Sequence, residues 1–162
     1  MGIDIAFWIL AVVGILAALA VVLLQNVFRA ALALVLCFLT VAGIYATLSA
    51  DFLAGVQVLI YVGAISVLII LAIMLTREVQ WGSTSNRLRI PAFFVAILFL
   101  GVMGFAMLNT LWTVSAVAPV EPTTAALAIK LFGEGGFILA VEIAALLLLV
   151  AIIGAIVLVR EK

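Results

Sequence analysis

Long apolar runs separated by short polar segments dominate the sequence. A bilayer core of about 30 Å needs roughly 20 apolar residues in a helix to cross it, and that length divides the chain into five apolar segments. They run approximately over residues 5–24, 30–49, 52–75, 90–111 and 137–159. The pattern predicts an all-α integral membrane protein, with five transmembrane helices in a single membrane domain over residues 1–162.

The segments between the apolar runs differ in length. Residues 25–29 and 50–51 are so short that the first three helices are expected to form a tight antiparallel array. Residues 76–89 are polar, and residues 112–136 contain Pro119, Pro122 and several glycines, so the fourth and fifth helices are expected to attach more loosely. Within that last loop, residues 123–132 are interpreted as a short interfacial helix. The chain shows no internal repeat, which argues against an inverted-repeat transporter.

Composition excludes several classes of protein and of site. Hydrophobic residues make up 70% of the 162 residues and charged residues only 9%, a balance that indicates the lipid bilayer as solvent. Seven basic and seven acidic residues cancel, which removes the basic footprint of a nucleic-acid-binding protein. The chain has no histidine and one cysteine, Cys37, so an intrachain disulfide, a four-cysteine iron–sulfur site and a cysteine/histidine zinc site are excluded. We therefore expect no catalytic, cofactor-binding or metal-binding residue in this chain.

The distribution of basic residues predicts an orientation. With five crossings, one side of the membrane receives Arg29, Arg77, Arg87, Arg89, Arg160 and Lys162, and the other side receives Lys130. Because cytoplasmic loops retain an excess of lysine and arginine, the C-terminus is expected in the cytoplasm and the N-terminus outside. The first four residues include Asp4 and no basic residue, unlike a secretory signal, so the first helix is expected to be retained.

Glu142 is the most informative charged position. It lies near the start of the fifth apolar segment, among isoleucine, leucine and valine residues. A carboxylate at the centre of a span costs about 2.5–3.5 kcal/mol on insertion scales, so such a group faces protein or water. Two interpretations stay open: a protonatable group on or beside a proton path, and an acid that reaches interfacial water or a neighbouring subunit.

The third segment carries several polar groups in its first half. Gln57 and Tyr61 are four residues apart and share a helix face. Gly63, Ala64 and Ser66 offer small surfaces, which in membrane helices ordinarily indicate close packing. The proximity of Tyr61 to Gly63 additionally favours a special backbone feature, because glycine tolerates geometry that strains other residues.

Two stretches resemble a known family. The run QVLIYVGAISVL at residues 57–68 is similar to the third helix of subunit J of the proton-pumping NADH-quinone oxidoreductase, respiratory complex I, which is subunit 6 in the mitochondrial naming. Glu142 followed by LLLLVAIIGAIV at residues 146–157 resembles the fifth helix of that family. The family often has a Pro-Phe-Glu run at this point, whereas Ala140 and Val141 precede the acid here.

The resemblance implies a non-catalytic subunit of a hetero-oligomer in the inner (plasma) membrane of a bacterium. Its neighbours would resemble subunits A, H, K and N, and flavin mononucleotide, iron–sulfur clusters and quinone would be bound by partner subunits. In the family the third helix switches between a regular α-helix and a form with a π-bulge. Here Tyr61, Val62 and Gly63 would form the gating bulge, and Gln57 and Ser66 would offer partners for the freed carbonyl.

Other functions stay open on the sequence. The chain is alternatively a scaffold that only holds its neighbours together, or the equivalent subunit of a membrane-bound hydrogenase or a multisubunit cation antiporter. A free-standing transporter would need its own polar pathway, and Glu142 is essentially the only intramembrane charge on offer.

Overall fold

The computed structural model describes residues 2–76, 88–112 and 123–159. Five helical spans in these residues are long and apolar enough to cross a membrane, which confirms the predicted all-helical class. The elements are α1 (Gly2–Leu23), α2 (Val27–Thr47), α3 (Asp51–Val56), η1 (Gln57–Ile65), α4 (Ser66–Leu75), α5 (Arg89–Asn109), α6 (Thr123–Phe132) and α7 (Ile138–Val159). The short helix expected at residues 123–132 is α6. Much of the basic cluster used to predict the orientation, namely Arg77, Arg87, Arg160 and Lys162, lies outside the described residues.

Local hydrogen bonds set the turns between the first three spans. The second span begins at Val27, three residues before the predicted start, because the Asn26 side chain caps the helix and accepts the Arg29 backbone N–H at 3.1 Å. It ends at Thr47, and Ser49 adopts a left-handed backbone with φ of 57°, which reverses the chain. The third span, Asp51–Leu75, then starts at once and runs through α3, η1 and α4 without a break.

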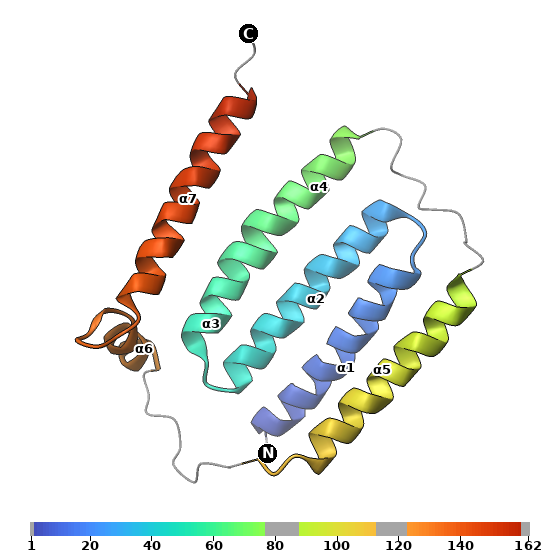
Figure 1. Ribbon diagram of the computed structural model, residues 1–162. Helices are drawn as coiled ribbons and strands as arrows, with labels where there is room; N and C mark the ends of the chain where they lie inside the picture. Colours follow the sequence, from blue (N-terminus) through green and yellow to red (C-terminus); the bar gives the residue numbers. More distant parts are fainter. Residues whose placement is uncertain (1, 77–87, 113–122, 160–162) are drawn as a thin grey trace.

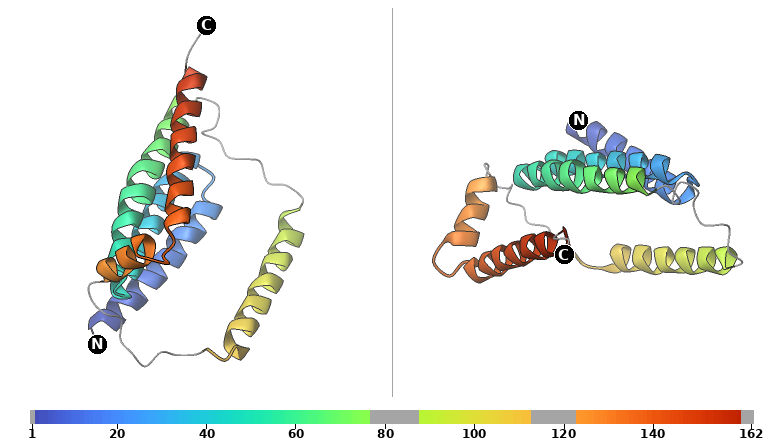
Figure 2. Two further views of the ribbon diagram at one scale, coloured as in Figure 1. Left: turned by 60° about the vertical axis from the view of Figure 1, so that its left-hand side comes forward. Right: turned by 90° about the horizontal axis from the view of Figure 1, so that it is seen from above.

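These three spans lie side by side in one layer, with α2 in the middle (Figures 1 and 2). The tight antiparallel array expected from the short turns is confirmed. Small residues let the helices approach: Ala17, Ala31 and Ala42 are the buried apolar residues of the described part of the chain. A Cβ added at Gly14 of α1 would lie 2.9 Å from Thr40 Oγ1 of α2, so the α1–α2 contact depends on that glycine.

The remaining two spans stand apart from this layer. Seen from above in Figure 2, α5 and α7 form a second row, and α6 lies at the edge between the row and the layer. Among the described elements α5 packs against none, and α7 packs only against α6. The α6 helix meets the layer at its N-terminus, where the Thr123 hydroxyl donates to the Ser49 carbonyl at 3.2 Å. The looser attachment predicted for the fourth and fifth spans is therefore seen in the structure.

Candidate functional site

The middle of the third span is wound as a π-helix. The nine residues Gln57–Ile65 form η1, and its neighbours Val56 and Ser66 have ordinary helical dihedrals, with φ of −62° at both. A π-helix of this length is rare, and such segments often mark functional sites. The predicted π feature is thus present, and it contains Tyr61, Val62 and Gly63.

Gly63 lies where the wider winding brings backbone atoms close. A Cβ at this position would lie 3.3 Å from the carbonyl oxygen of Val58, five residues earlier. That spacing is tighter than an ordinary van der Waals contact, so a larger side chain would push against the backbone of the preceding turn. The residue type at position 63 is therefore matched to the π-helical geometry.

Ser66 closes the C-terminal end of η1. Its backbone N–H points to the Tyr61 carbonyl and also to that of Gly63, and its hydroxyl donates to the Tyr61 carbonyl at 2.6 Å. The Tyr61 carbonyl thus receives two donors from one residue. Ser66 is 2% exposed, so the rest of the chain shields this hydrogen bond from solvent.

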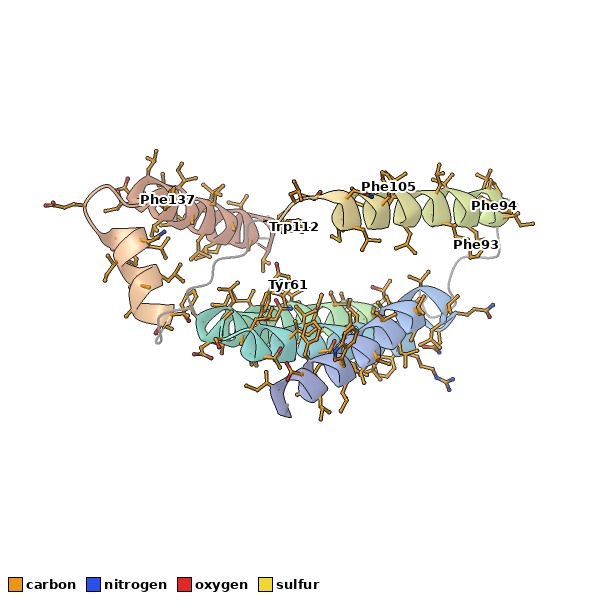
Figure 3. The ribbon with its side chains drawn as sticks, turned by 90° about the horizontal axis from the view of Figure 1, so that it is seen from below. Tyr61, Phe93, Phe94, Phe105, Trp112 and Phe137 are labelled. Atoms are coloured by element: carbon orange, nitrogen blue, oxygen red, sulfur yellow. The ribbon has the colours of Figure 1, made fainter. Side chains whose placement is uncertain are left out.

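The N-terminal half of η1 is joined to α2 through Phe38. The Gln57 side chain amide donates to the Phe38 carbonyl in a long hydrogen bond of 3.4 Å. The Tyr61 ring meets the Phe38 ring edge-on, with centroids 5.4 Å apart and an interplanar angle of 63°, an arrangement that aromatic pairs favour. Gln57 is buried, whereas Tyr61 is 43% exposed. Figure 3 shows Tyr61 on the side of the layer that faces the row of α5 and α7.

Phe38 is the residue of this site that the sequence interpretation missed. It lies within an apolar run of α2 and carries no polar group that would single it out. A usable signal was the short turn between the second and third spans, because antiparallel helices joined by so few residues pair positions at similar distances from the turn. Counting outward from that turn brings Phe38 opposite the region of Gln57 and Tyr61.

Glu142 lies on a helix that does not pack against η1. It is the fifth residue of α7 and is exposed, and α7 makes contact with α6 but not with the third span. Within the described residues the Glu142 carboxylate has no hydrogen bond or ion pair. The structure therefore does not join the two candidate elements into one site within this chain.

The turn that precedes α7 is built from glycines at residues 133, 135 and 136. Gly135 has a φ of +75°, a conformation that L-residues with a side chain rarely adopt. A Cβ at Gly136 would lie 2.5 Å from the Lys130 carbonyl oxygen and 2.9 Å from that of Gly133. This turn directs α7 away from α6, and so it sets where Glu142 lies.

Metal-ligating residues do not cluster in the part of the chain that the structure describes. No group of three or more cysteine, aspartate or glutamate side chains comes together there in a way that would hold a metal ion. A shallow apolar groove of about 680 Å³ crosses α1, α2 and the start of the third span, but Gln57, Tyr61 and Ser66 do not line it. Two of the three buried polar side chains in the described residues, Gln57 and Ser66, lie at the two ends of η1.

Comparison with known proteins identifies the family. The family model for NADH-ubiquinone/plastoquinone oxidoreductase chain 6 matches residues 17–158. The chain is 38% identical over 161 residues to NAD(P)H-quinone oxidoreductase chain 6 of Leptolyngbya boryana, covering 98% of this chain and 80% of the relative. It is 41% identical over 163 residues to chain 6 of Synechocystis sp., with 97% and 80% covered.

An archaeal relative shows that the family extends beyond enzymes named for NAD(P)H. The chain is 37% identical over 154 residues to F(420)H(2) dehydrogenase subunit J of Methanosarcina mazei, covering 93% of this chain and 86% of the relative. These matches agree with the resemblance carried by residues 57–68 and by the fifth span. The chain belongs to the chain 6, or subunit J, family and is a multi-pass membrane subunit of a complex I-type quinone oxidoreductase.

Proposed function

We propose that the third span gates the hydration of a path that joins the quinone site of the complex to its proton channels. The observation that carries this proposal is the π-helical segment η1, with Gly63 at its crowded point and the Tyr61 carbonyl bonded by Ser66. A residue inserted into or removed from a turn rotates everything beyond it by about 100°. Loss of the π winding would therefore turn the side chains of α4 relative to those of α3.

The gate acts as a two-state element whose equilibrium is biased by quinone chemistry in a neighbouring subunit. Tyr61, Val62 and Gly63 form its moving part. Gln57 and Ser66 supply the polar contacts at its two ends. Redox chemistry belongs to the partner subunits, which bind flavin mononucleotide, iron–sulfur clusters and quinone. The electron donor is NADH in this proposal, and the neighbours resemble subunits A, H, K and N in the inner membrane of a bacterium.

Glu142 is proposed to exchange protons on or beside the path. Its exposure and its lack of a partner among the described residues fit a carboxylate that meets water or another subunit. Because α7 does not pack against the third span within this chain, any coupling between the gate and Glu142 passes through other subunits of the complex.

The variant Gly63→Val tests the gate. A β-branched side chain would press on the Val58 carbonyl and disfavour the π form. A bias of 1–2 kcal/mol would change the ratio of the two forms by roughly 5- to 30-fold. We expect protons pumped per electron delivered to quinone to fall markedly in the assembled complex, measured in proteoliposomes.

Gly55→Val is the matched control, because Gly55 lies in α3 of the same span and nothing lies within 4 Å of its Cβ position. Pumping should be close to normal in this control. Unchanged pumping in Gly63→Val, at normal assembly, would rule the gate out.

A scaffold role is the second candidate, and the exposed second row favours it. Large apolar side chains such as Phe93, Phe99 and Leu148 are 62–66% exposed, and among the described elements α5 packs against none, so this row offers its faces to neighbouring subunits as well as to lipid. If this is the whole role, variants in the third span will lower the amount of assembled complex without changing turnover per complex.

A further inference from the structure

The buried polar side chains of the described residues are few, and two of them bracket the π segment. The buried polar residues are Thr40, Gln57 and Ser66, whose exposed fractions are 3%, 8% and 2%. Gln57 is the first residue of η1, and Ser66 directly follows its last residue. A buried polar group with a specific partner constrains conformation strongly, because leaving it without a hydrogen bond is costly.

The acceptor that Ser66 uses distinguishes it from the other hydroxyl groups on these helices. Thr40 and Thr47 donate to the carbonyl three residues back, and Thr76 and Thr110 to the carbonyl four residues back. These are the ordinary local partners of serine and threonine in a helix. Ser66 donates five residues back, to Tyr61, at 2.6 Å. That acceptor is within reach because the turn is widened.

The two ends of the segment are held in different ways. The side-chain amide of Gln57 donates to the Phe38 carbonyl of α2, so the start of η1 is fixed to a neighbouring helix. Ser66 bonds only within its own span. A change of winding would therefore leave the start of η1 in place, rotate α4 against α2, with which it packs, and take the Tyr61 carbonyl away from the Ser66 hydroxyl.

We propose that Ser66 is a positioning residue that stabilises the π form of the third span through its hydroxyl. In the π form the hydroxyl bonds to the Tyr61 carbonyl. In a regular α-helix it would have to turn to the carbonyl of Val62 or Gly63. Ser66 thus sets the ratio of the two forms. Its consequence for pumping rests on the gating function proposed above, whereas its effect on the winding does not.

The test is Ser66→Ala in the intact complex. Alanine removes the hydroxyl and is the strongest helix former. Loss of one net hydrogen bond should lower the ratio of π to α form by about two- to tenfold. The ratio is measured by classifying electron cryo-microscopy particles on the winding of residues 57–65, at rest and during turnover.

Two further variants make the test specific. Thr40→Val deletes a hydroxyl that is equally buried and bonds to its own helix, but lies in α2, and it should leave the ratio unchanged. Ser66→Thr keeps the hydroxyl and should restore the wild-type ratio. An unchanged ratio in Ser66→Ala, or an equal fall in Thr40→Val, would overturn the proposal.

A second measurement follows the rotation of α4 directly. Cys37 is the only cysteine of this chain, so a Cys37→Ala background with Leu71→Cys, exposed on α4, gives this chain a single site for a spin label. Adding Ser66→Ala should change the label's mobility or its distance to a second label on a partner subunit, and no change would contradict the proposal.

The outcomes also separate this inference from the gate. A lowered π ratio with unchanged pumping per electron would support the role of Ser66 and remove the gating function. An unchanged ratio would reject the role of Ser66 whatever pumping does.

Discussion

The layer of α1, α2 and the third span and the row of α5 and α7 are built from similar residues but are packed very differently. Gly14 and Gly43 in the layer have side-chain atoms of a neighbouring helix within 3.0 Å of where a Cβ would lie. Gly101, Gly104 and Gly154 in the row have nothing within 4 Å. Lipid tails are as apolar as leucine, so association of membrane helices needs close packing. The layer achieves this within the chain, and the row does not.

The chain thus has one part whose helices pack against one another and one part whose long helices do not pack against the layer. Within the layer, short turns and small residues fix the helices, and the π segment is joined to α2 there. In the row, only the turn after α6 positions α7 in the described structure. A membrane subunit of a larger assembly can leave such spans to be held by neighbouring subunits.

The largest expected effect is on the layer. In Gly14→Val the new side chain would collide with the Thr40 hydroxyl, which is buried and bonded to the Cys37 carbonyl at 2.7 Å. Overpacking of this kind costs about 1–3 kcal/mol. We expect a lower temperature of thermal inactivation and less assembled complex, measured on purified membranes.

Gly104→Val makes the matching change on α5, where the structure leaves space, and serves as the control. If Gly14→Val and Gly104→Val lower stability equally, α5 packs as tightly against a partner subunit as α1 does against α2. The difference in packing between the layer and the row would then hold only for the isolated chain.

An intermediate effect is expected at the turn before α7. In Gly136→Ala the methyl group would meet two backbone carbonyl oxygens, at 2.5 and 2.9 Å, and neither can move without changing the turn. The cost should be about 1 kcal/mol or more, seen as reduced assembly, since α7 would be misdirected. Gly154→Ala, within α7 and free of close neighbours, should assemble normally. Normal assembly of Gly136→Ala would show that partner subunits, and not this turn, position α7.

The smallest effect on assembly, yet a clear one on function, is expected for Glu142→Gln. An exposed carboxylate with no partner among the described residues contributes little to stability, within about 0.5 kcal/mol, so the amount of complex should be unchanged. Proton pumping should slow severalfold, because glutamine cannot exchange a proton, and this is measured as the initial rate of vesicle acidification. Glu134→Gln, in the turn outside α7, is the control. Pumping at the normal rate would reduce Glu142 to a structural acid.

Much of this arrangement could be predicted from particular residues. The lengths of the apolar runs gave the five spans, and the two short turns gave the antiparallel layer. The resemblance at residues 57–68 led to the π segment that the structure contains. The second span begins three residues earlier than the apolar pattern predicts, because hydropathy does not register the cap that the polar Asn26 side chain supplies. Gln57 and Ser66 were both predicted to bond to the freed carbonyl; in the structure Ser66 donates to the Tyr61 carbonyl, whereas Gln57 donates to the Phe38 carbonyl of α2. The pairing of Phe38 with Tyr61 was not predicted.

The sequence by itself determined that the chain is an integral membrane protein and how many times it crosses the bilayer. It also excluded a four-cysteine iron–sulfur site and a cysteine/histidine zinc site, because the chain has no histidine and one cysteine. Only the tertiary structure decided which faces of the spans meet, that the Tyr61 ring packs on Phe38, and that the Gln57 side chain bonds to the Phe38 carbonyl of α2. The reason is physical: in a soluble helix an apolar stripe marks the buried face, whereas in a membrane span every face is apolar and hydropathy cannot tell a face that packs from one that meets lipid.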